Sequence, residues 1–383
     1  MKISNVDVLH IEGSNDYWIW LRMKTDGGME GWGEVTGSGD DKVLATIVQT
    51  LSTKLVGRDA LNLDGCIEAC SQTSFPNNTS NRFISTAISG IDQCLWDIRA
   101  QYFNIPLYWL LGGYEKCEIP LYANLNRGLL TDRSPEALEK NGLKAVENGF
   151  SFVKCTPFDE VTPGGNSISV QPGLSRLANL VSKVGMEKIA IDCHQRFNRV
   201  QAYQFLEYLK DFDTPFWVED LLFEGTLRDQ KMVYTDFPSI RWAGGETACN
   251  IKDILLLIQN GFLDVIMPDV KHCGGVSALK TIIPLIESSG TKVSLHNPSG
   301  PIATAFSAHL LSLSSNPEPL EYPWGSVPER KERMQPFEPV SNGIYYLSDL
   351  PGIGIKPREE FLESHAHVWE EGMWRKWKSK ITE

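Results

Sequence analysis

No stretch of this chain is both apolar and long enough to cross a bilayer, which takes about 20 residues. With 42% hydrophobic and 22% charged residues, the composition is that of an ordinary globular protein. The first residues, MKISNVDVLHIEG, lack the basic, apolar and small-residue regions of a signal peptide. We therefore expect a cytoplasmic protein without a membrane partner.

Paired cysteines and basic clusters are also missing. The eight cysteines are scattered and form no CxxC pair, so we expect free thiols in a reducing compartment. The formal net charge is −12 and no run of Lys or Arg occurs, which argues against nucleic acid as a partner. A small anionic substrate is still compatible with this charge, because a bound metal ion can reverse the local sign.

The first hundred residues read as strands followed by helices. Residues 3–11 and 17–24 alternate like two strands, and the turn TDGG leads to a third strand, EGWGE. Apolar residues then recur at helical spacing from Arg82 to Tyr102, and LLGG closes this region. The pattern predicts an α+β unit.

From about Ile119, short apolar strands alternate with amphipathic helices. Eight such strands are predicted, beginning near residues 119, 152, 188, 216, 241, 264, 292 and 320. Alternation at this spacing implies parallel strands, and eight of them close into a (β/α)₈ barrel of the TIM type rather than an open sheet.

Polar residues follow these strands at a regular interval. Spacings of 27, 27, 23, 27 and 25 residues separate Asp192, Glu219, Glu246, Asp269, His296 and Glu321. Each is predicted to lie at the C-terminal end of its strand, the edge at which TIM barrels carry their active sites. Together with Lys154, these side chains should converge on one cavity.

Asp192, Glu219 and Glu246 end three consecutive strands. A carboxylate among apolar residues is costly unless it is paired or bound to a metal. Three carboxylates, with room for water and substrate oxygens, suit octahedral Mg²⁺ better than Zn²⁺, which prefers nitrogen and sulfur ligands. The alternative is that each acid pairs with a Lys or Arg at the barrel rim, but three acids in successive strands favour the metal.

Asp269 and His296 end the next two strands, which are neighbours in a barrel. A carboxylate beside an imidazole fixes its tautomer and raises its basicity, which predicts a general base; the alternative is a structural histidine. Glu321, in LEYPWG, is interpreted as a hydrogen-bonding group, which could be protonated, against a developing enolate oxygen. The alternative for Glu321 is an ion pair at the rim.

This order of residues, together with GIDQCLWDI at 90 and HNPSGPIA at 296, resembles the mandelate racemase group of the enolase superfamily across nearly the whole chain. The resemblance implies an α/β fold, with a barrel of residues 116–340 and an α+β capping domain of residues 1–115 completed by residues 341–383. It also implies Mg²⁺ on the three acids, a His–Asp dyad as base and a homo-oligomer.

The chain departs from the racemase pattern after the second barrel strand. Racemases of the group carry Lys-x-Lys there, the second lysine being the base for the opposite face. Here the segment is Lys154-Cys155-Thr156, so the second amine is missing. We expect Lys154 to neutralise the substrate carboxylate and Thr156 to contact the substrate, the alternative being that Lys154 is a rim lysine.

His194 follows the first predicted metal ligand, Asp192, by two residues, and residues i and i+2 of a strand face the same side. Asp-x-His resembles the galactonate and mannonate dehydratase branches, where such a histidine is the acid that protonates the leaving 3-hydroxyl. General acid catalysis suits this step, because elimination of hydroxide is otherwise slow. A structural His194 bonded to the barrel rim is the alternative.

Two further features lie outside the barrel. Arg82 falls where the second capping loop of this group usually lies, and is a candidate to hold a distal carboxylate or hydroxyl of the substrate. Trp369, Met373 and Trp377 recur every four residues, which predicts one face of a C-terminal helix packed against the rest of the protein.

The combined prediction is a Mg²⁺-dependent hydro-lyase. It removes the C2 proton of a sugar acid, eliminates the 3-hydroxyl as water and yields a 2-keto-3-deoxy acid. The enzymatic alternative is an epimerase, racemase or cycloisomerase that uses the same enolate. The alternative of another class is a barrel that binds sugar acids without turnover, although binding alone needs no dyad.

Overall fold

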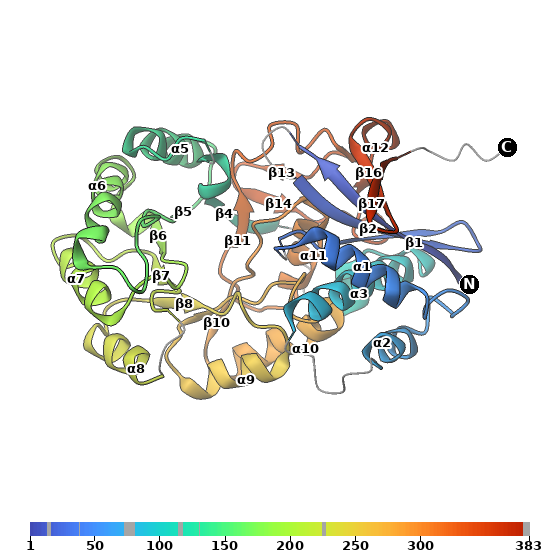
Figure 1. The fold of residues 1–383 in the computed structure, drawn as a ribbon, viewed down its shortest axis with the longest axis horizontal. Helices are drawn as coiled ribbons and strands as arrows, with labels where there is room; N and C mark the ends of the chain where they lie inside the picture. Colours follow the sequence, from blue (N-terminus) through green and yellow to red (C-terminus); the bar gives the residue numbers. More distant parts are fainter. Residues whose placement is uncertain are drawn as a thin grey trace.

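The computed structural model describes residues 1–13, 17–37, 39–72, 81–113, 118–129, 131–223 and 227–377. Figure 1 shows a ring of alternating strands and helices beside an α+β part in which both ends of the chain meet. No helix in these residues is long and apolar enough to span a membrane. The described cysteines are all free and buried, whereas Cys117 lies outside the described residues.

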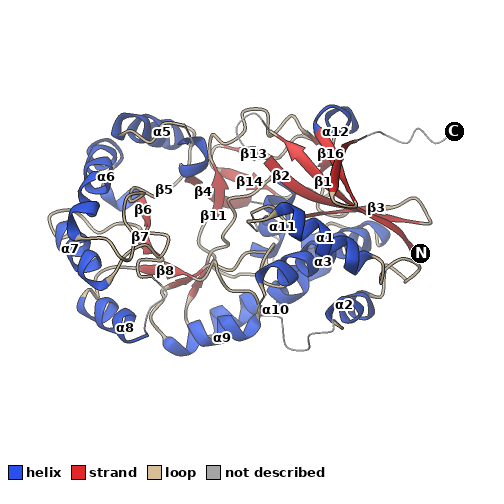
Figure 2. Cartoon of the chain, viewed as in Figure 1, coloured by secondary structure: helices blue, strands red, loops and turns tan. Residues whose placement is uncertain are grey.

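Both ends of the chain contribute to one antiparallel sheet of five strands (Figure 2). Its order is β17 (Met373–Lys376), β16 (Ala366–Glu370), β1 (Ile3–Glu12), β2 (Tyr17–Thr25) and β3 (Glu30–Glu34). The three N-terminal strands are those predicted from alternation. The helices of this part are α1 (Asp41–Ser52), α2 (Leu63–Ser71), α3 (Arg82–Tyr102), α4 (Leu107–Leu111) and α12 (Glu359–His365).

Helix α3 has the predicted bounds and joins the two parts of the molecule. Its N-cap, Asn81, accepts hydrogen bonds from the N–H groups of Phe83 and Ile84, which the helix itself leaves unpaired. Farther along the helix, Asp92 accepts a hydrogen bond of 2.5 Å from the Ser277 hydroxyl of helix α10 in the barrel. Helix α3 is thereby joined directly to the barrel.

The C-terminal segment is a hairpin, so the predicted helix over Trp369 to Trp377 is wrong. Strands β16 and β17 pair with each other, and β16 also pairs with β1, as in the register Leu9 to Val368. These ladder hydrogen bonds override a local pattern of apolar residues. The predicted packing is confirmed for the two tryptophans, which are buried, whereas the Met373 side chain is 67% exposed.

The eight predicted barrel strands are all present. They are β4 (Glu118–Asn124), β5 (Val153–Cys155), β6 (Ile189–Asp192), β7 (Trp217–Glu219), β8 (Trp242–Gly244), β9 (Val265–Ile266), β10 (Lys292–Val293) and β11 (Leu320–Pro323). Parallel pairing runs in chain order from β4 to β10, and β11 pairs with β4. Between β10 and β11, the Glu318 N–H donates to the Val293 carbonyl at 2.8 Å. The fold class is therefore the predicted one.

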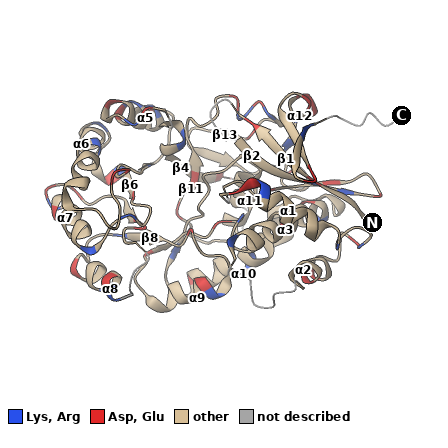
Figure 3. Cartoon of the chain, viewed as in Figure 1, with Lys and Arg blue, Asp and Glu red and all other residues tan. Residues whose placement is uncertain are grey.

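Helices cover the outside of this ring. They are α5 (Pro135–Glu147), α6 (Gln171–Val184), α7 (Arg199–Leu209), α8 (Leu227–Asp236), α9 (Ile251–Asn260), α10 (Gly275–Ser288) and α11 (Pro301–Leu311). In the view of Figure 3, Lys and Arg positions are interspersed with Asp and Glu along the described parts of these helices. Short pairs, β12 (Met334–Gln335) with β15 (Lys356–Pro357) and β13 (Val340–Ser341) with β14 (Ile344–Tyr346), complete the chain.

An apolar layer lies inside the barrel, with residues from or next to strands β4 to β9. Its buried members are Tyr122, Phe152, Ala190, Trp217, Ala243, Val265 and Met267. Tyr122 and Phe152 stack at a ring distance of 4.7 Å, and Trp217 lies edge-on to both. Because these residues precede the polar ends of their strands, the layer lies beneath the polar cluster described next.

Candidate active site

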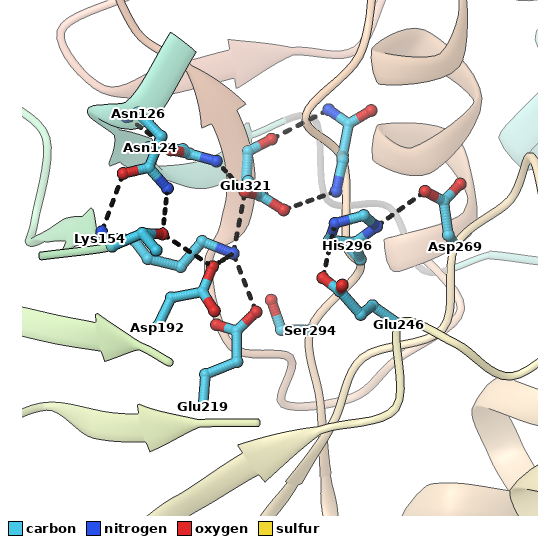
Figure 4. Close-up of polar contacts among 12 residues, drawn as sticks. Asn124, Asn126, Lys154, Asp192, Glu219, Glu246, Asp269, Ser294, His296 and Glu321 are labelled. Atoms are coloured by element: carbon cyan, nitrogen blue, oxygen red, sulfur yellow. Dashed lines mark hydrogen bonds and ion pairs between the residues drawn. The ribbon is translucent and has the colours of Figure 1, made fainter. Parts of the chain in front are cut away.

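Seven predicted side chains converge at the carboxyl edge of the barrel, as Figure 4 shows: Lys154, Asp192, Glu219, Glu246, Asp269, His296 and Glu321. Asp192 and Glu219 are the last residues of their strands. The next three lie in the loops after β8, β9 and β10, because these strands pair for only two or three residues. Glu321 is within β11, which continues pairing with β4 as far as Pro323. The prediction that every residue ends its strand is thus wrong in detail.

The Lys154 ammonium stands among three of the carboxylates. Its Nζ lies 2.9 Å from Glu219 Oε1, 3.0 Å from Glu321 Oε1 and 3.6 Å from Asp192 Oδ2. Burial alone would lower the pKa of Lys154, but the surrounding carboxylates hold it well above its ordinary value. Lys154 is therefore a fixed cation, and not a lysine at the exposed rim.

Glu219 is held from two sides. Lys154 bonds one oxygen, and the indole Nε1 of Trp217 donates to Oε2 at 3.1 Å. Burial still raises the pKa of Glu219 to about 7, despite the lysine. Sequence reasoning missed Trp217, although it lies two residues before Glu219 on the same face of the strand.

His194 contacts Asp192, but not through the strand geometry expected from the sequence. Strand β6 ends at Asp192, and His194 and Gln195 both have left-handed backbone conformations, with φ of 47° and 53°. The turn carries the imidazole back, so that Nε2 lies 2.9 Å from Asp192 Oδ2. The charge of Asp192 raises the pKa of His194 to about 9.

His296 bridges two carboxylates. Its Nδ1 lies 2.8 Å from Asp269 Oδ2, and its Nε2 lies 2.9 Å from Glu246 Oε2. Burial opposes a charged ring, but Glu246 and Asp269 outweigh it and raise the pKa of His296 to about 10. With Glu246 in this position the imidazolium is favoured. For His296 to accept a proton from a substrate, its Nε2 would have to be free of Glu246.

Asp269 has a cationic partner, Lys271, that sequence reasoning missed. The Lys271 N–H donates to Oδ1 at 2.7 Å, and the Lys271 ammonium lies 3.1 Å from Oδ2. The His272 ring is 3.8 Å away and donates or accepts at Thr86 of α3. Burial alone would raise the pKa of Asp269, yet Lys271 holds it well below the ordinary range. The position of Lys271, two residues after the acid, is the only signal in the sequence.

Glu321 accepts hydrogen bonds in this structure. Asn124 donates its amide to Oε1 at 2.5 Å, and the Asn297 N–H donates to Oε2 at 2.7 Å. Burial would raise the pKa of Glu321, but Lys154 and His296 keep it below its ordinary value. Both oxygens accept, so the arrangement favours a carboxylate over the protonated form considered from the sequence.

Thr156 lies between two polar side chains. Its hydroxyl is 3.3 Å from Asp192 Oδ2 and 2.6 Å from the Asn126 amide nitrogen. Arg82, the first residue of α3, makes no hydrogen bond or ion pair to this cluster in the described part of the chain. Its charge acts instead on Cys249 and His272, whose pKa values are set mainly by burial.

The donor chemistry of the site fits a hard divalent cation. Five carboxylates face two lysines, and the Lys154 ammonium already stands where two of the predicted ligands meet. Carboxylate oxygens are ligands that Mg²⁺ prefers. In the described residues no three His, Cys, Asp or Glu side chains are gathered closely enough to hold an ion. Glu246, the third predicted ligand, contacts His296. The predicted ligands are therefore of the type that binds Mg²⁺. To join Asp192 and Glu219 as a ligand, Glu246 would have to give up its contact with His296.

Family models match both parts of the chain. The model described as mandelate racemase / muconate lactonizing enzyme, N-terminal domain, matches residues 12–112, and the enolase C-terminal domain-like model matches residues 137–361. A D-xylonate dehydratase of Haloferax volcanii is 27% identical, over 95% of this chain and 89% of that protein. A D-galactonate dehydratase of Pectobacterium atrosepticum is 26% identical, over 98% of both chains.

Solved structures agree with these matches. An enolase from Agrobacterium radiobacter, solved with sodium and L-malate, superimposes with a TM-score of 0.80 at 27% identity, covering 100% of this chain and 98% of that one. The matched family models agree with the observed fold and with the order of the polar residues along the chain. This chain belongs to the mandelate racemase and muconate lactonizing enzyme group of the enolase superfamily.

Proposed function

We propose that this protein is a Mg²⁺-dependent acid-sugar dehydratase that forms a 2-keto-3-deoxy acid. The observation that carries the proposal is the pairing of a His296–Asp269 dyad with a second imidazole, His194, at the opposite end of the row of predicted ligands. The names of the relatives, D-xylonate and D-galactonate dehydratase, support the same reaction class. The proposal includes the predicted domain boundaries, a cytoplasmic location and a homo-oligomer.

Asp192, Glu219 and Glu246 would hold the Mg²⁺. When bound, the ion supplies fixed positive charge for the substrate carboxylate and for the enolate that forms from it. Lys154 already carries a fixed charge beside two of these acids, and we assign it to the same carboxylate. The charge is in place before the reaction, so little reorganisation is needed when the proton leaves.

His296 acts as the base. Its Nδ1–H is held by Asp269, which leaves Nε2 to take the C2 proton while the C–H electron pair moves into the enolate. Nε2 is occupied by Glu246 in this structure, so the base becomes available when Glu246 is engaged as a ligand. This coupling makes proton abstraction depend on assembly of the whole site.

His194 acts as the acid. Its Nε2 lies 2.9 Å from Asp192 Oδ2, and its side chain is 41% exposed. Its proton goes to the departing 3-hydroxyl, which leaves as water. The enolate electrons form the C2–C3 double bond, and the resulting enol tautomerises to the keto acid.

An epimerase using the same enolate is the enzymatic alternative. It needs a proton donor on the opposite face, where Thr156 is bonded to Asn126 and Asp192. A barrel that binds sugar acids without turnover is the alternative of another class. The dyad argues against it, because binding does not require a base held by a buried carboxylate. Arg82 remains a candidate for the distal end of the substrate.

A library screen tests the proposal. Mono- and diacid sugars would be incubated with the protein and Mg²⁺, and 2-keto acid would be assayed with and without exhaustive chelation. We expect keto acid from one structural subset of the library, with formation lost on chelation and restored by added Mg²⁺. Full activity after chelation would contradict the metal, and inverted substrate without keto acid would favour the epimerase.

A further inference from the structure

Two asparagines at the end of the first barrel strand connect the strands on either side of it. Asn124 ends β4, and Asn126 begins the short 3₁₀ turn that follows. Strand β4 pairs with β11, which carries Glu321, and with β5, after which Thr156 follows. Figure 4 shows the Asn124 amide directed toward Glu321 and the Asn126 amide directed toward the end of β5.

Backbone groups fix the orientation of both amides. The Asn126 N–H donates to Asn124 Oδ1 at 2.9 Å, and the Thr156 N–H donates to Asn126 Oδ1 at 2.8 Å. A backbone N–H can only donate, so the atom facing it must be the amide oxygen. Each NH₂ group must then point the other way, Asn124 toward Glu321 and Asn126 toward the Thr156 hydroxyl.

This orientation determines where the Thr156 proton goes. A hydroxyl has one proton and two acceptor sites. The Asn126 NH₂ occupies one acceptor site at 2.6 Å, and Asn126 Oδ1 is already engaged by the Thr156 N–H. The remaining polar neighbour of the hydroxyl is Asp192 Oδ2, at 3.3 Å. The hydroxyl therefore donates to Asp192.

We propose that Thr156, oriented by Asn126, is a positioning residue that sets the Asp192 carboxylate for metal binding. The inference rests on the proposed function, in which Asp192 is a ligand. It changes the assignment of Thr156 from a substrate contact to a support of the metal site. Thr156 is 3% exposed, and its hydroxyl has no further protein partner in the described residues to which it could turn.

Mn²⁺ affinity is the direct measurement, because groups that orient a metal ligand typically change affinity about 10–100-fold. Thr156→Val removes the hydroxyl and keeps the shape, and should raise the Mn²⁺ dissociation constant of the full-length protein by about this factor. Thr156→Ser keeps the hydroxyl and should bind close to native. Circular dichroism and melting in chelator would establish that each variant is folded.

A double-mutant cycle tests the role of Asn126. Asn126→Asp keeps the oxygen that receives the Thr156 N–H but replaces the NH₂ with an acceptor, so the Thr156 hydroxyl turns away from Asp192. The negative charge added by Asn126→Asp should have the same direct effect on Mn²⁺ binding whether residue 156 is Thr or Val. We expect Asn126→Asp to weaken Mn²⁺ binding more, or strengthen it less, when Thr156 is present than in the Thr156→Val background.

The outcomes separate this inference from the function beneath it. If the native protein binds Mn²⁺ and the Thr156→Val variant binds it with the same dissociation constant, the inference is overturned and the dehydratase proposal is left intact. Equal effects of Asn126→Asp in both backgrounds would overturn the part assigned to Asn126. Absence of saturable binding in the native protein would contradict the metal assignment, and with it this inference.

Discussion

Asp269 Oδ2 lies 2.8 Å from His296 Nδ1 and 3.1 Å from the Lys271 ammonium, so one oxygen serves both the imidazole and a fixed cation. The Lys271 N–H holds the other oxygen. The carboxylate cannot rotate without breaking its contacts with His296, the Lys271 ammonium and the Lys271 N–H. The orientation of the imidazole is therefore set by residues packed behind it.

The His296–Asp269 dyad predicts that exchange of the substrate α-proton is lost to different extents when each residue is replaced. His296→Asn should stop exchange of the substrate α-proton with D₂O together with turnover, because the base acts first. Asp269→Asn should slow exchange by mis-setting the tautomer while leaving some activity. Proton NMR of the C2 position follows both. Unchanged exchange in the His296 variant would mean that Lys154 or another group is the base.

The carboxylate row predicts dependence on a divalent ion. Glu219→Gln and Glu246→Gln should each abolish keto acid formation and weaken Mg²⁺ binding, since each removes a charge and a ligand from a three-acid site. Isothermal titration with Mg²⁺ measures the binding, and circular dichroism shows whether the fold is kept. A folded Glu246→Gln variant with native Mg²⁺ affinity would show that this acid is not a ligand.

His309 predicts a pH dependence of stability that is separate from catalysis. It is fully buried in α11, where Nδ1 accepts from the Tyr108 N–H and the other nitrogen lies 3.2 Å from the Ile353 carbonyl. Burial lowers the pKa of His309 to about 4 from 6.5. Between these values the unfolded chain binds more protons than the folded one. Stability is therefore complete above about pH 6.5 and falls toward pH 4.

His309→Gln tests this dependence. Glutamine can accept and donate as the neutral ring does but does not titrate. The variant should lose a slope of at most about 1.4 kcal/mol per pH unit in the free energy of unfolding. Urea midpoints of both proteins over this range measure it. Parallel midpoint curves for the two proteins would show that His309 does not contribute.

Much of this architecture was accessible from the sequence. Periodicity is a property of consecutive residues, so helix α3 and the eight strands could be predicted. The topology of a TIM barrel then brings residues such as Asp192 and Glu321 together, however far apart they are in the chain. The supporting contacts were less accessible, because Asn126 and Lys271 matter through the atoms they face and not through any repeat.

Two errors have the same physical origin. The hairpin containing Trp369 forms because β1 offers an edge, which lies far away in the sequence. His194 reaches Asp192 through a left-handed turn, where strand alternation no longer applies. Local patterns failed at both places because distant or backbone hydrogen bonds decide the conformation.

Elimination and epimerisation are separated most directly by proton NMR of a turned-over sugar acid in D₂O with Mg²⁺, using the native protein and His194→Asn. We predict that the native protein forms keto acid without C2 epimer. The variant should continue to exchange the α-proton through His296 while keto acid formation slows by roughly 10²–10⁴, the contribution of general acid catalysis. Accumulation of C2-inverted substrate in place of keto acid would contradict the dehydratase assignment.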